Sequence, residues 1–427
     1  MNLAWQIEQN LPQQVAELVR AISREADGLG QKVYLVGGAV RDLLLGDPSL
    51  CSGLRFDVDL VVEGDAIKLA HQVAKITEAK VLTHPRFGTA KLSYGNFTLD
   101  MATARHEIYA KPGALPEVTP GAIQDDLSRR DFSINAMAIS LAPSNYGELL
   151  DPYRGKSDLE HRLVRILHPK SFRDDATRIL RAIRYEQRLG FELESQTARL
   201  LKRDTPMLET ISGDRIRHEL ELILKEKYPE GIIKRLGELG VLHKINFSLQ
   251  GNGWIAEKFD KARQLSSPGQ LSSLYFCLLG YRLSERENEK FVLYLNISKK
   301  LAKQLRHTLC LKDQLPLLDK PLMKHSEIYY LLHEYDSLAI QANAIASESS
   351  TACRNLELFL SKLRYVKVLL RGEELQKLGI PAGPDLGRIL KTLHKAKLDG
   401  EVNTKAEEIK LALLAKTTKA RNGRPQN

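Results

Sequence analysis

The pattern of hydrophobic and polar positions changes its period along the chain. In the first third, short β-branched runs alternate with glycine and proline, which is typical of strands joined by turns. Beyond about Ser171, leucine-rich segments follow the 3.6-residue period of helices. The two regimes predict at least two domains: an α+β part with a mixed sheet, followed by an all-helical part.

The first part contains a run of strands around a glycine turn. A buried strand is expected at residues 32–36, a turn at Gly37-Gly38 and the start of a helix at residues 40–45. Further strands are expected at residues 57–62, 89–94 and 96–102. Prolines and glycines interrupt residues 106–128 so often that we expect no regular element there, but a long mobile loop that serves as a moving part.

The second part reads as a bundle or solenoid of helices without a fixed-period repeat. Helices are expected at residues 174–189, 215–224, 271–283, 298–313 and 350–370. Residues 412–427 carry four basic side chains and no acidic one, which fits a solvated tail and a contact with RNA equally well.

Composition narrows the class of protein. The chain has 427 residues, with 63 Lys and Arg against 53 Asp and Glu, a formal net charge of +10. The longest dense apolar stretch, residues 274–279, is far short of the roughly 20 residues that span a bilayer, and no signal-peptide pattern is present, so we expect a cytoplasmic protein without membrane contact. Four widely spaced cysteines indicate neither a disulfide framework nor a zinc site. The positive charge favours an anionic partner, but it does not distinguish nucleic acid from a soluble surface.

Three carboxylates fall on neighbouring predicted strands. Asp57 and Asp59 are two positions apart, so their side chains share one face of a strand. Asp100 offers a third carboxylate on another strand. Oxygen ligands of this kind favour magnesium or manganese, and three of them suit a two-metal site for phosphoryl transfer. Taken alone, the Asp57-x-Asp59 pair is also consistent with acids exposed on an edge strand.

The turn before these acids suits a triphosphate. Gly37 and Gly38 let the backbone approach an anion closely at a helix start, and Arg41 follows one turn later. Arg41 alone would read as a surface cation on a short helix. A glycine turn about twenty residues before a D-x-D pair resembles the superfamily to which DNA polymerase beta belongs.

Five segments in order make the resemblance specific. They are LVGGAVRD at residues 35–42, DVD at 57–59, RRDFSINA at 129–136, DPYRG at 151–155 and DDATRILRAIR at 174–184. This series resembles the class II tRNA nucleotidyltransferases, the bacterial-type CCA-adding enzymes, which share their catalytic half with bacterial poly(A) polymerases. Residues 372–400, with LGIPAGP at 378–384, are similar to the tail of some CCA-adding enzymes.

The resemblance implies roles for individual residues of the front half. Asp57 and Asp59 would hold the metals, with Asp100 where relatives often have glutamate. Gly38 and Arg41 would contact the triphosphate. The incoming nucleotide's sugar and phosphates would meet Arg130 and Asp131.

The last segment implies a protein template for the base. Asp175 and Arg178, three apart on one predicted helix, would share a face. Cytosine and adenine present an amine beside an acceptor on the pairing edge, whereas uracil and guanine present a carbonyl there, so a carboxylate with a guanidinium accepts the first two bases. Arg181 and Arg184 continue the row toward the nucleotide. An isolated pair of this kind would be an ordinary intrahelical ion pair. Residues 215–219 resemble a motif that supports the template helix, and they also fit a solvated charged face.

The expected protein is a template-independent nucleotidyltransferase that adds CCA, or its terminal A, to tRNA from CTP and ATP with Mg²⁺. Its expected parts are a polymerase-beta-like head (1–145), a neck with the base-reading helix (146–215), a body (216–300) and a tRNA-binding tail (301–427). An A-adding enzyme, a poly(A) polymerase and a non-catalytic RNA-binding protein remain alternatives. Members that add only CC resemble the chain less, because they lack the loop expected at residues 106–128. The oligomeric state stays open.

Overall fold

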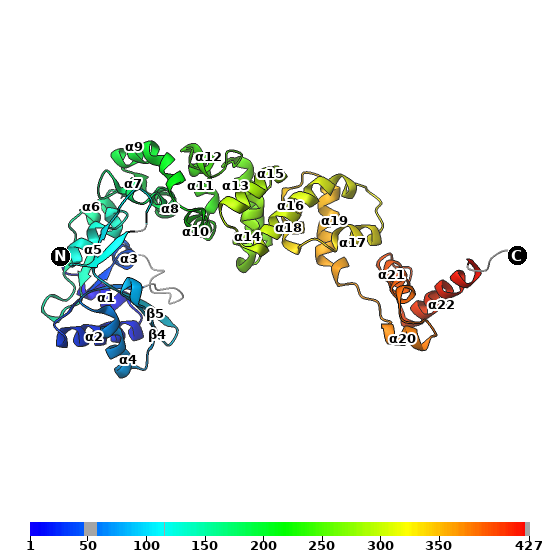
Figure 1. The fold of residues 1–427 in the computed structure, drawn as a ribbon, viewed down its shortest axis with the longest axis horizontal. Coiled ribbons are helices and arrows are strands. Elements are labelled where there is room, and N and C mark those ends of the chain that lie inside the picture. The colour runs from blue at the N-terminus through cyan, green and yellow to red at the C-terminus, as the bar shows by residue number, and fades with distance from the viewer. Residues whose placement is uncertain (47–57, 115, 423–427) are drawn as a thin grey trace. The chain divides into compact units, whose positions relative to one another are not determined.

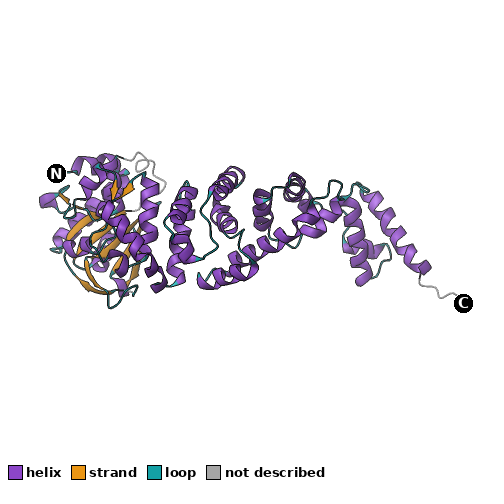
Figure 2. Cartoon of the chain, turned by 90° about the horizontal axis from the view of Figure 1, so that it is seen from above, coloured by secondary structure: helices purple, strands orange, loops and turns teal. Residues whose placement is uncertain are grey.

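The computed structural model describes residues 1–46, 58–114 and 116–422. The chain divides into two compact units, Met1–Ile245 and Asn246–Asn427. Within the described residues, every strand lies in the first unit, and the second unit is built of helices (Figure 2). The α+β fold class is therefore confirmed, whereas the finer division into four parts stays a prediction.

A seven-stranded mixed sheet forms the centre of the first unit, with the order β3-β4-β5-β2-β1-β8-β9. β2 and β5 are parallel, and the other neighbouring pairs are antiparallel. The strands are β1 (Lys32–Val36), β2 (Val58–Glu63), β3 (Lys80–His84), β4 (Thr89–Tyr94), β5 (Phe97–Thr103), β8 (Ala138–Ser140) and β9 (Leu149–Leu150). The four predicted strands are all present, although Asp57 lies outside the described residues.

The two faces of the sheet differ because side chains alternate along a strand. Val58, Leu60 and Val62 of β2 are buried on the face that packs against α2 (Gln13–Gly28) and α4 (Ala66–Thr77) (Figure 1). Asp59, between the first two, points to the opposite face and is exposed. In the sheet register Asp59 lies opposite Asp100 of β5, so the two carboxylates share that face.

The glycine turn connects β1 to α3 (Gly38–Leu45). Gly37 has a φ of 69°, and a Cβ at this position would lie 2.8 Å from the Arg130 Nη1 atom. Glycine is therefore required both for the backbone conformation and for the close approach of the arginine.

The loop expected at residues 106–128 is wrong in part, because the segment holds regular elements. β6 (Arg105–Ile108) and β7 (Glu117–Pro120) pair as a separate antiparallel ribbon, and α5 (Ile123–Ser128) follows. Pro120 is tolerated because it pairs at the end of an isolated two-stranded ribbon, where few ladder hydrogen bonds are lost. The frequent prolines and glycines mark only the connections.

The helix expected over residues 174–189 is also corrected. α7 (Ser171–Asp174) ends before Asp175, which is extended, and α8 (Thr177–Leu189) begins after it. The Asp175 carboxylate accepts hydrogen bonds from the backbone N–H (2.9 Å) and hydroxyl (2.6 Å) of Thr177. Asp175 thus stabilises the start of α8 from outside the helix, as aspartate commonly does at helix N-termini.

The remaining helices and short strands of the first unit flank the sheet in sequence, α1 before its first strand and the others after β9. They are α1 (Ala4–Asn10), α6 (Gly155–Glu160), α9 (Ser195–Asp204), α10 (Gly213–Leu224), α11 (Pro229–Glu238), α12 (Val241–Ile245) and the two-residue strands β10 (Leu163–Val164) and β11 (Glu192–Leu193).

Among the residues that the structure describes, the second unit includes a hydrophobic core around Leu311, Leu356 and Phe359 and another around Leu375 and Leu393. Its helices are α13 (Gly253–Leu265), α14 (Pro268–Leu279), α15 (Glu285–Tyr294), α16 (Lys299–Leu318), α17 (His325–Leu332), α18 (Ser337–Ala346), α19 (Ser350–Ser361), α20 (Gly372–Lys377), α21 (Pro384–Leu398) and α22 (Lys405–Asn422).

The helix expected over residues 350–370 ends early. α19 stops at Ser361, a 3-10 turn follows at Leu363–Tyr365, and Val366 is extended. Leu363 and Val366 still pack on the first core, so their apolar spacing reflects a turn folded onto the core.

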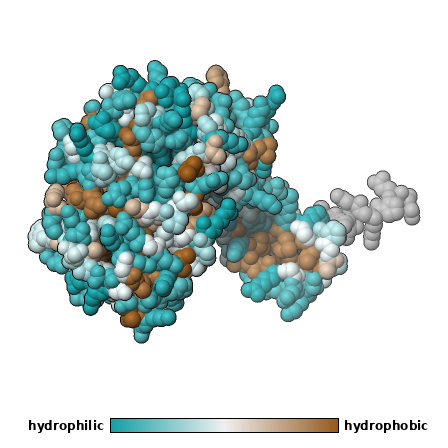
Figure 3. Space-filling view, turned by 60° about the vertical axis from the view of Figure 1, so that its left-hand side comes forward, coloured by the Kyte–Doolittle hydropathy of each residue, from teal (hydrophilic) through white to brown (hydrophobic). Residues whose placement is uncertain are grey.

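The surface is mostly hydrophilic, with separate hydrophobic patches on the face that Figure 3 shows. No helix of the described residues is long and apolar enough to cross a membrane.

Candidate active site

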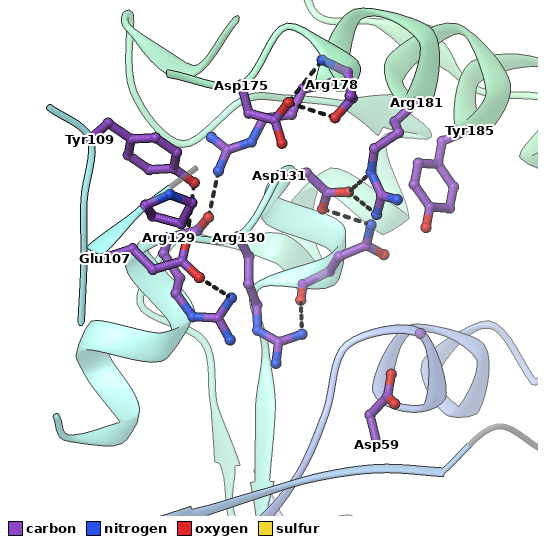
Figure 4. Close-up of a pocket in the computed structure, with 14 residues that line it drawn as sticks. Asp59, Glu107, Tyr109, Arg129, Arg130, Asp131, Asp175, Arg178, Arg181 and Tyr185 are labelled. Carbon is purple, nitrogen blue, oxygen red and sulfur yellow. Dashed lines mark hydrogen bonds and ion pairs between the residues drawn. The ribbon is translucent and has the colours of Figure 1, made fainter. Parts of the chain in front are cut away.

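A polar cavity of about 420 Å³ lies in the first unit, between the sheet and the start of α8 (Figure 4). Side chains from both sides of the cavity point into it, with Asp59 on the sheet and Arg181 on α8 facing it from opposite directions. Its lining residues are Gly38, Asp59, Glu107, Tyr109, Pro116, Arg129, Arg130, Asp131, Asn135, Asp175, Thr177, Arg178, Arg181 and Tyr185.

A buried ion pair forms the floor of the cavity. Asp131 Oδ2 accepts hydrogen bonds from Arg181 Nε (2.9 Å) and Nη2 (2.6 Å), and Asp131 Oδ1 accepts one from Asn135 Nδ2 (3.0 Å). Burial alone would raise the pKa of Asp131, but Arg181 and Asn135 lower it to about 2. Asp131 in turn raises the pKa of Arg181. The pair is charged at neutral pH and connects α8 to the segment that carries Asp131.

Two neighbouring arginines share one buried acid. Arg129 and Arg130 both donate to the fully buried carboxylate of Asp126 on α5, Arg130 through Nη2 at 2.9 Å. Arg129 also donates to Glu107 on β6 (3.1 Å), and the Tyr109 hydroxyl donates to the same carboxylate (2.9 Å). Burial, followed by the charge of Glu107, raises the pKa of Tyr109. Residues 106–128, which were expected to form a loop, therefore contact the RRD motif through Glu107 and Arg129.

The predicted base-reading pair lies at the other end of the cavity. Arg178 donates to Ser171 Oγ (2.7 Å) and to the backbone oxygen of Arg129 (2.6 Å). Asp175 accepts a hydrogen bond from Arg215 Nη2 (2.7 Å) on α10. Asp175 lies outside α8, so it does not share a helix face with Arg178. Both residues still line the cavity, Asp175 held by Arg215 of α10 and Arg178 held by Ser171 and Arg129.

Tyr185 of α8 gathers three guanidinium groups. Its ring centre lies 5.3 Å from Arg41 Cζ, 5.8 Å from Arg181 Cζ and 5.2 Å from Arg184 Cζ. Buried Glu219 of α10 pairs with Arg181 (3.4 Å) and Arg184 (3.7 Å). These contacts, with that of Arg215, favour the supporting role of residues 215–219 over a solvated face.

The DPYRG segment, residues 151–155, packs against the 129–136 motif that lines the cavity. The Asp151 carboxylate accepts hydrogen bonds from the backbone N–H groups of Gly155 (2.6 Å) and Lys156 (3.0 Å). A Cβ at Gly155 would lie 2.2 Å from the backbone oxygen of Ser133, so only glycine allows this segment to pack on the 129–136 motif.

The acidic face of the sheet borders a second cavity of about 510 Å³, which shares Asp59, Arg129 and Arg130 with the first and also contacts Asp100. Asp100 Oδ2 lies 3.2 Å from Lys91 Nζ. No cluster of three metal-ligating side chains occurs among the described residues, which do not include Asp57. Two exposed carboxylates opposite each other on parallel strands are hard oxygen donors that fit a divalent cation.

The structure therefore distributes the predicted residues over three places. Seven line the first cavity: Gly38, Asp59, Arg130, Asp131, Asp175, Arg178 and Arg181. Asp100 lines the second cavity, and Asp57 lies outside the described residues. Arg41 and Arg184 are buried behind the lining.

The buried arginines have acidic partners. Arg41 donates to Asp42 through Nε (2.7 Å) and to Asn135 through Nη1 (2.8 Å), and Arg184 pairs with Glu226 (3.3 Å). Burial lowers the pKa of Arg41, but the contact with Asp42 outweighs it and raises the pKa overall. The Arg41 Nη2 atom still lies 3.5 Å from where a Cβ on Gly38 would be, directly beneath the glycine turn.

Sequence reasoning missed the other lining residues, which are Glu107, Tyr109, Pro116, Arg129, Asn135, Thr177 and Tyr185. Arg129, Asn135, Thr177 and Tyr185 lie within or beside the recognised motifs, so their positions were a usable signal. Glu107 and Tyr109 belong to the segment expected to be a loop, where no local pattern indicated a contact with Arg129.

Comparison with known families places the head first. Residues 33–165 match the family described as the poly A polymerase head domain, and residues 190–247 match the one described as a probable RNA and SrmB-binding site of polymerase A. Fold and cavity thus define a nucleotidyltransferase-type head with a helical extension.

Relatives that match nearly the whole chain show to which family of nucleotidyltransferases it belongs. The chain is 33% identical to the A-adding tRNA nucleotidyltransferase of Halalkalibacterium halodurans, over 93% of this chain and 91% of the relative. It is 32% identical to the A-adding enzyme of Geobacter sulfurreducens over 95% of this chain, and it spans about half (48%) of that relative's length. The Thermotoga maritima CCA-adding enzyme complexed with tRNA superposes with a TM-score of 0.76 at 29% identity, covering 97% of this chain and 98% of the other. The chain belongs to the class II tRNA nucleotidyltransferase family.

Proposed function

We propose that this protein adds CCA, or its terminal A, to the 3′ end of tRNA, using ATP and CTP and releasing pyrophosphate. One observation carries the proposal: a single cavity is bounded by Asp59 on the sheet and by Asp175 and Arg178 at the start of α8. The acid suited to chemistry and the pair suited to base recognition thus face the same space. A nucleoside triphosphate with its phosphates toward the sheet and its base toward α8 fits this arrangement.

The phosphate end of the cavity uses charge and backbone donors. Asp59, with Asp57 and Asp100 as further carboxylates, would hold Mg²⁺, which when bound neutralises charge on the phosphates. The 3′ hydroxyl oxygen of the tRNA attacks the α-phosphorus, the bond to the β-phosphate oxygen breaks, and the electron pair leaves with pyrophosphate while the hydroxyl proton passes to water. Gly38 at the start of α3 offers a close backbone approach, and Arg41 beneath it adds positive charge.

The base end selects the nucleotide. The Asp175 carboxylate would accept from the exocyclic amine of adenine or cytosine, and the Arg178 guanidinium would donate to the neighbouring ring acceptor. Uracil and guanine present a carbonyl to the carboxylate, and that unfavourable contact excludes them. The sugar and phosphates would meet Arg130 and Asp131, which line the same cavity, and Arg181 of α8 holds Asp131 in place.

The helical remainder would grip the tRNA by shape and backbone charge, which suits a substrate recognised without its sequence. We retain the division into a head (1–145), a neck (146–215), a body (216–300) and a tail (301–427) as part of this proposal. The cytoplasm is the expected site of action. An enzyme restricted to the terminal A is a second candidate, favoured by the A-adding activity named for both curated relatives.

The test uses three tRNAs that end at the discriminator base, at C and at CC, with CTP and ATP supplied singly and together. Completion of all three supports full CCA addition. Adenylation of only the CC-ended tRNA supports the A-adding candidate. Long A tails on unrelated RNA would replace the proposal with a poly(A) polymerase, and no incorporation into any RNA would overturn it.

A further inference from the structure

A row of side chains crosses four strands on the acidic face of the sheet. Leu82 of β3 lies opposite Lys91 of β4, Lys91 opposite Asp100 of β5, and Asp100 opposite Asp59 of β2. All four line the second cavity, and His84, two positions after Leu82 on the same strand face, lines it too. The face therefore changes in order from apolar to cationic to acidic.

The apolar end of this row is unusual for its exposure. Leu82 is 59% exposed, on the face of β3 opposite the one that packs against α4. His84 beside it is exposed as well. The His84 imidazole offers a ring on which a nucleotide base can stack, and Leu82 beside it adds apolar surface against which the base can pack.

In the sheet register Lys91 lies between this surface and the carboxylates. Lys91 is half-exposed and pairs with Asp100, and Arg105, Arg129 and Arg130 border the same cavity. Positive side chains beside a stacking surface complement the backbone phosphate of an RNA end. The cavity is therefore complementary to a nucleotide along its whole length.

The geometry points to the second cavity as the seat of the tRNA's 3′-terminal nucleotide. We infer that its base stacks on Leu82 and His84, its phosphate lies by Lys91 and Arg105, and its 3′ hydroxyl reaches the first cavity past Asp59. In-line attack requires the acceptor oxygen and the leaving pyrophosphate to lie on opposite sides of the α-phosphorus, and Asp59, which both cavities share, lies where an acceptor in the second cavity and a triphosphate in the first would meet. This inference rests on the proposed function and adds the acceptor subsite to it.

The kinetic test uses Leu82→Ala and His84→Ala in the full-length protein, with a short RNA hairpin ending in CC as acceptor so that contacts with the rest of a tRNA do not mask the effect. Because stacking on an aromatic ring is worth about tenfold or more in affinity, we expect His84→Ala to raise KM for the hairpin about tenfold and Leu82→Ala to raise it less, while KM for ATP stays within about twofold in both. Ile76→Ala is the matched control, since Ile76 is also 59% exposed but lies on α4, against the other face of the sheet. A rise in KM for ATP alone, or an effect no larger than that of Ile76→Ala, would overturn the inference.

A second readout does not depend on turnover. The hairpin is given 5-iodocytidine as its terminal nucleotide, irradiated with the protein without ATP, and the crosslinked peptide is identified by mass spectrometry. The inference expects crosslinks in residues 80–94 that are lost in Leu82→Ala. Crosslinks in α8 instead would overturn it. If crosslinks appear at residues 80–94 but the wild-type protein extends no RNA, the acceptor subsite stands and the proposed function fails.

Discussion

The two ends of the active-site cavity are built in opposite ways. At the sheet end, Asp59 is exposed, and Asp100 on the neighbouring strand is exposed and pairs with the partly exposed Lys91. At the α8 end, Asp131 and Arg178 are buried and held by hydrogen bonds from several elements. Under the proposed function, the difference means that the base-reading end would be organised before the substrate binds, whereas the chemical end would be completed by a divalent metal, the triphosphate and the acceptor.

The largest effect is expected at the open end. Replacing Asp59 with Ala should reduce nucleotide incorporation by about a thousandfold or more, because charge stabilisation of the reacting phosphates is lost. Binding of tRNA, measured by filter retention, should change little, since Asp59 is exposed and supports no core. Loss of tRNA binding or of the folded state would show instead that Asp59 is structural and would remove the contrast between the two ends.

At the organised end, selectivity should fall more than rate. Arg178→Ala removes the guanidinium donor that faces the base, so we expect the preference for ATP over UTP to fall by about ten- to a hundredfold. Competition assays with both nucleotides measure it directly. Arg188→Ala on the same helix is the control, because Arg188 is partly exposed and its ionic partner is Glu226 outside the cavity. Equal selectivity in Arg178→Ala and Arg188→Ala would refute the template role.

The buried pair should also appear in acid stability. The folded-state pKa of Asp131, about 2, lies below its ordinary value of 3.8, so the charged carboxylate stabilises the fold fully above pH ~4 and this contribution is lost as the pH falls toward 2. The contribution amounts to about 2 kcal/mol of unfolding free energy. Urea unfolding between pH 5 and 2.5 should therefore show a shallower pH dependence in Asp131→Asn than in the wild type. The same slope in both proteins would mean that Arg181 does not stabilise the Asp131 charge.

The smallest effect is expected for the exposed pair. Lys91→Gln breaks the contact with Asp100, but both side chains are about half-exposed, and such pairs contribute about 0–1 kcal/mol. The melting temperature should therefore change by a few degrees at most. A loss of stability as large as that of Asp131→Asn would show that the open face is as tightly organised as the α8 end.

Much of this arrangement was predictable from the sequence, because local patterns report on local structure. The first strands and the glycine turn follow from residue type and spacing, whereas the motif residues that line the cavity follow from the resemblance of the five segments to the class II tRNA nucleotidyltransferases. The break in the helix at Asp175 could not be predicted in this way. The apolar positions from Ile179 onward fit one continuous helix, and they carry no sign of the Asp175 side chain that bonds to Thr177 at the start of α8.

Long-range partners account for the other misses. Arg41 reads as a cation free to meet a phosphate, but Asn135, 94 positions away, and Tyr185 enclose it. The prolines and glycines of residues 106–128 predict a loop, whereas the β6–β7 ribbon is stabilised by its own strand pairing and by the contact of Glu107 with Arg129. Neither contact leaves a periodic signal in the sequence.

The central claim is that chemistry and base selection act on one bound nucleotide from opposite ends of one cavity. Its most direct test is the binding preference for ATP over UTP, measured by calorimetry without tRNA, in Asp59→Ala and Arg178→Ala. The account predicts that Asp59→Ala keeps the preference although it has lost catalysis, and that Arg178→Ala loses the preference. A preference that survives in Arg178→Ala, or disappears in Asp59→Ala, would contradict it.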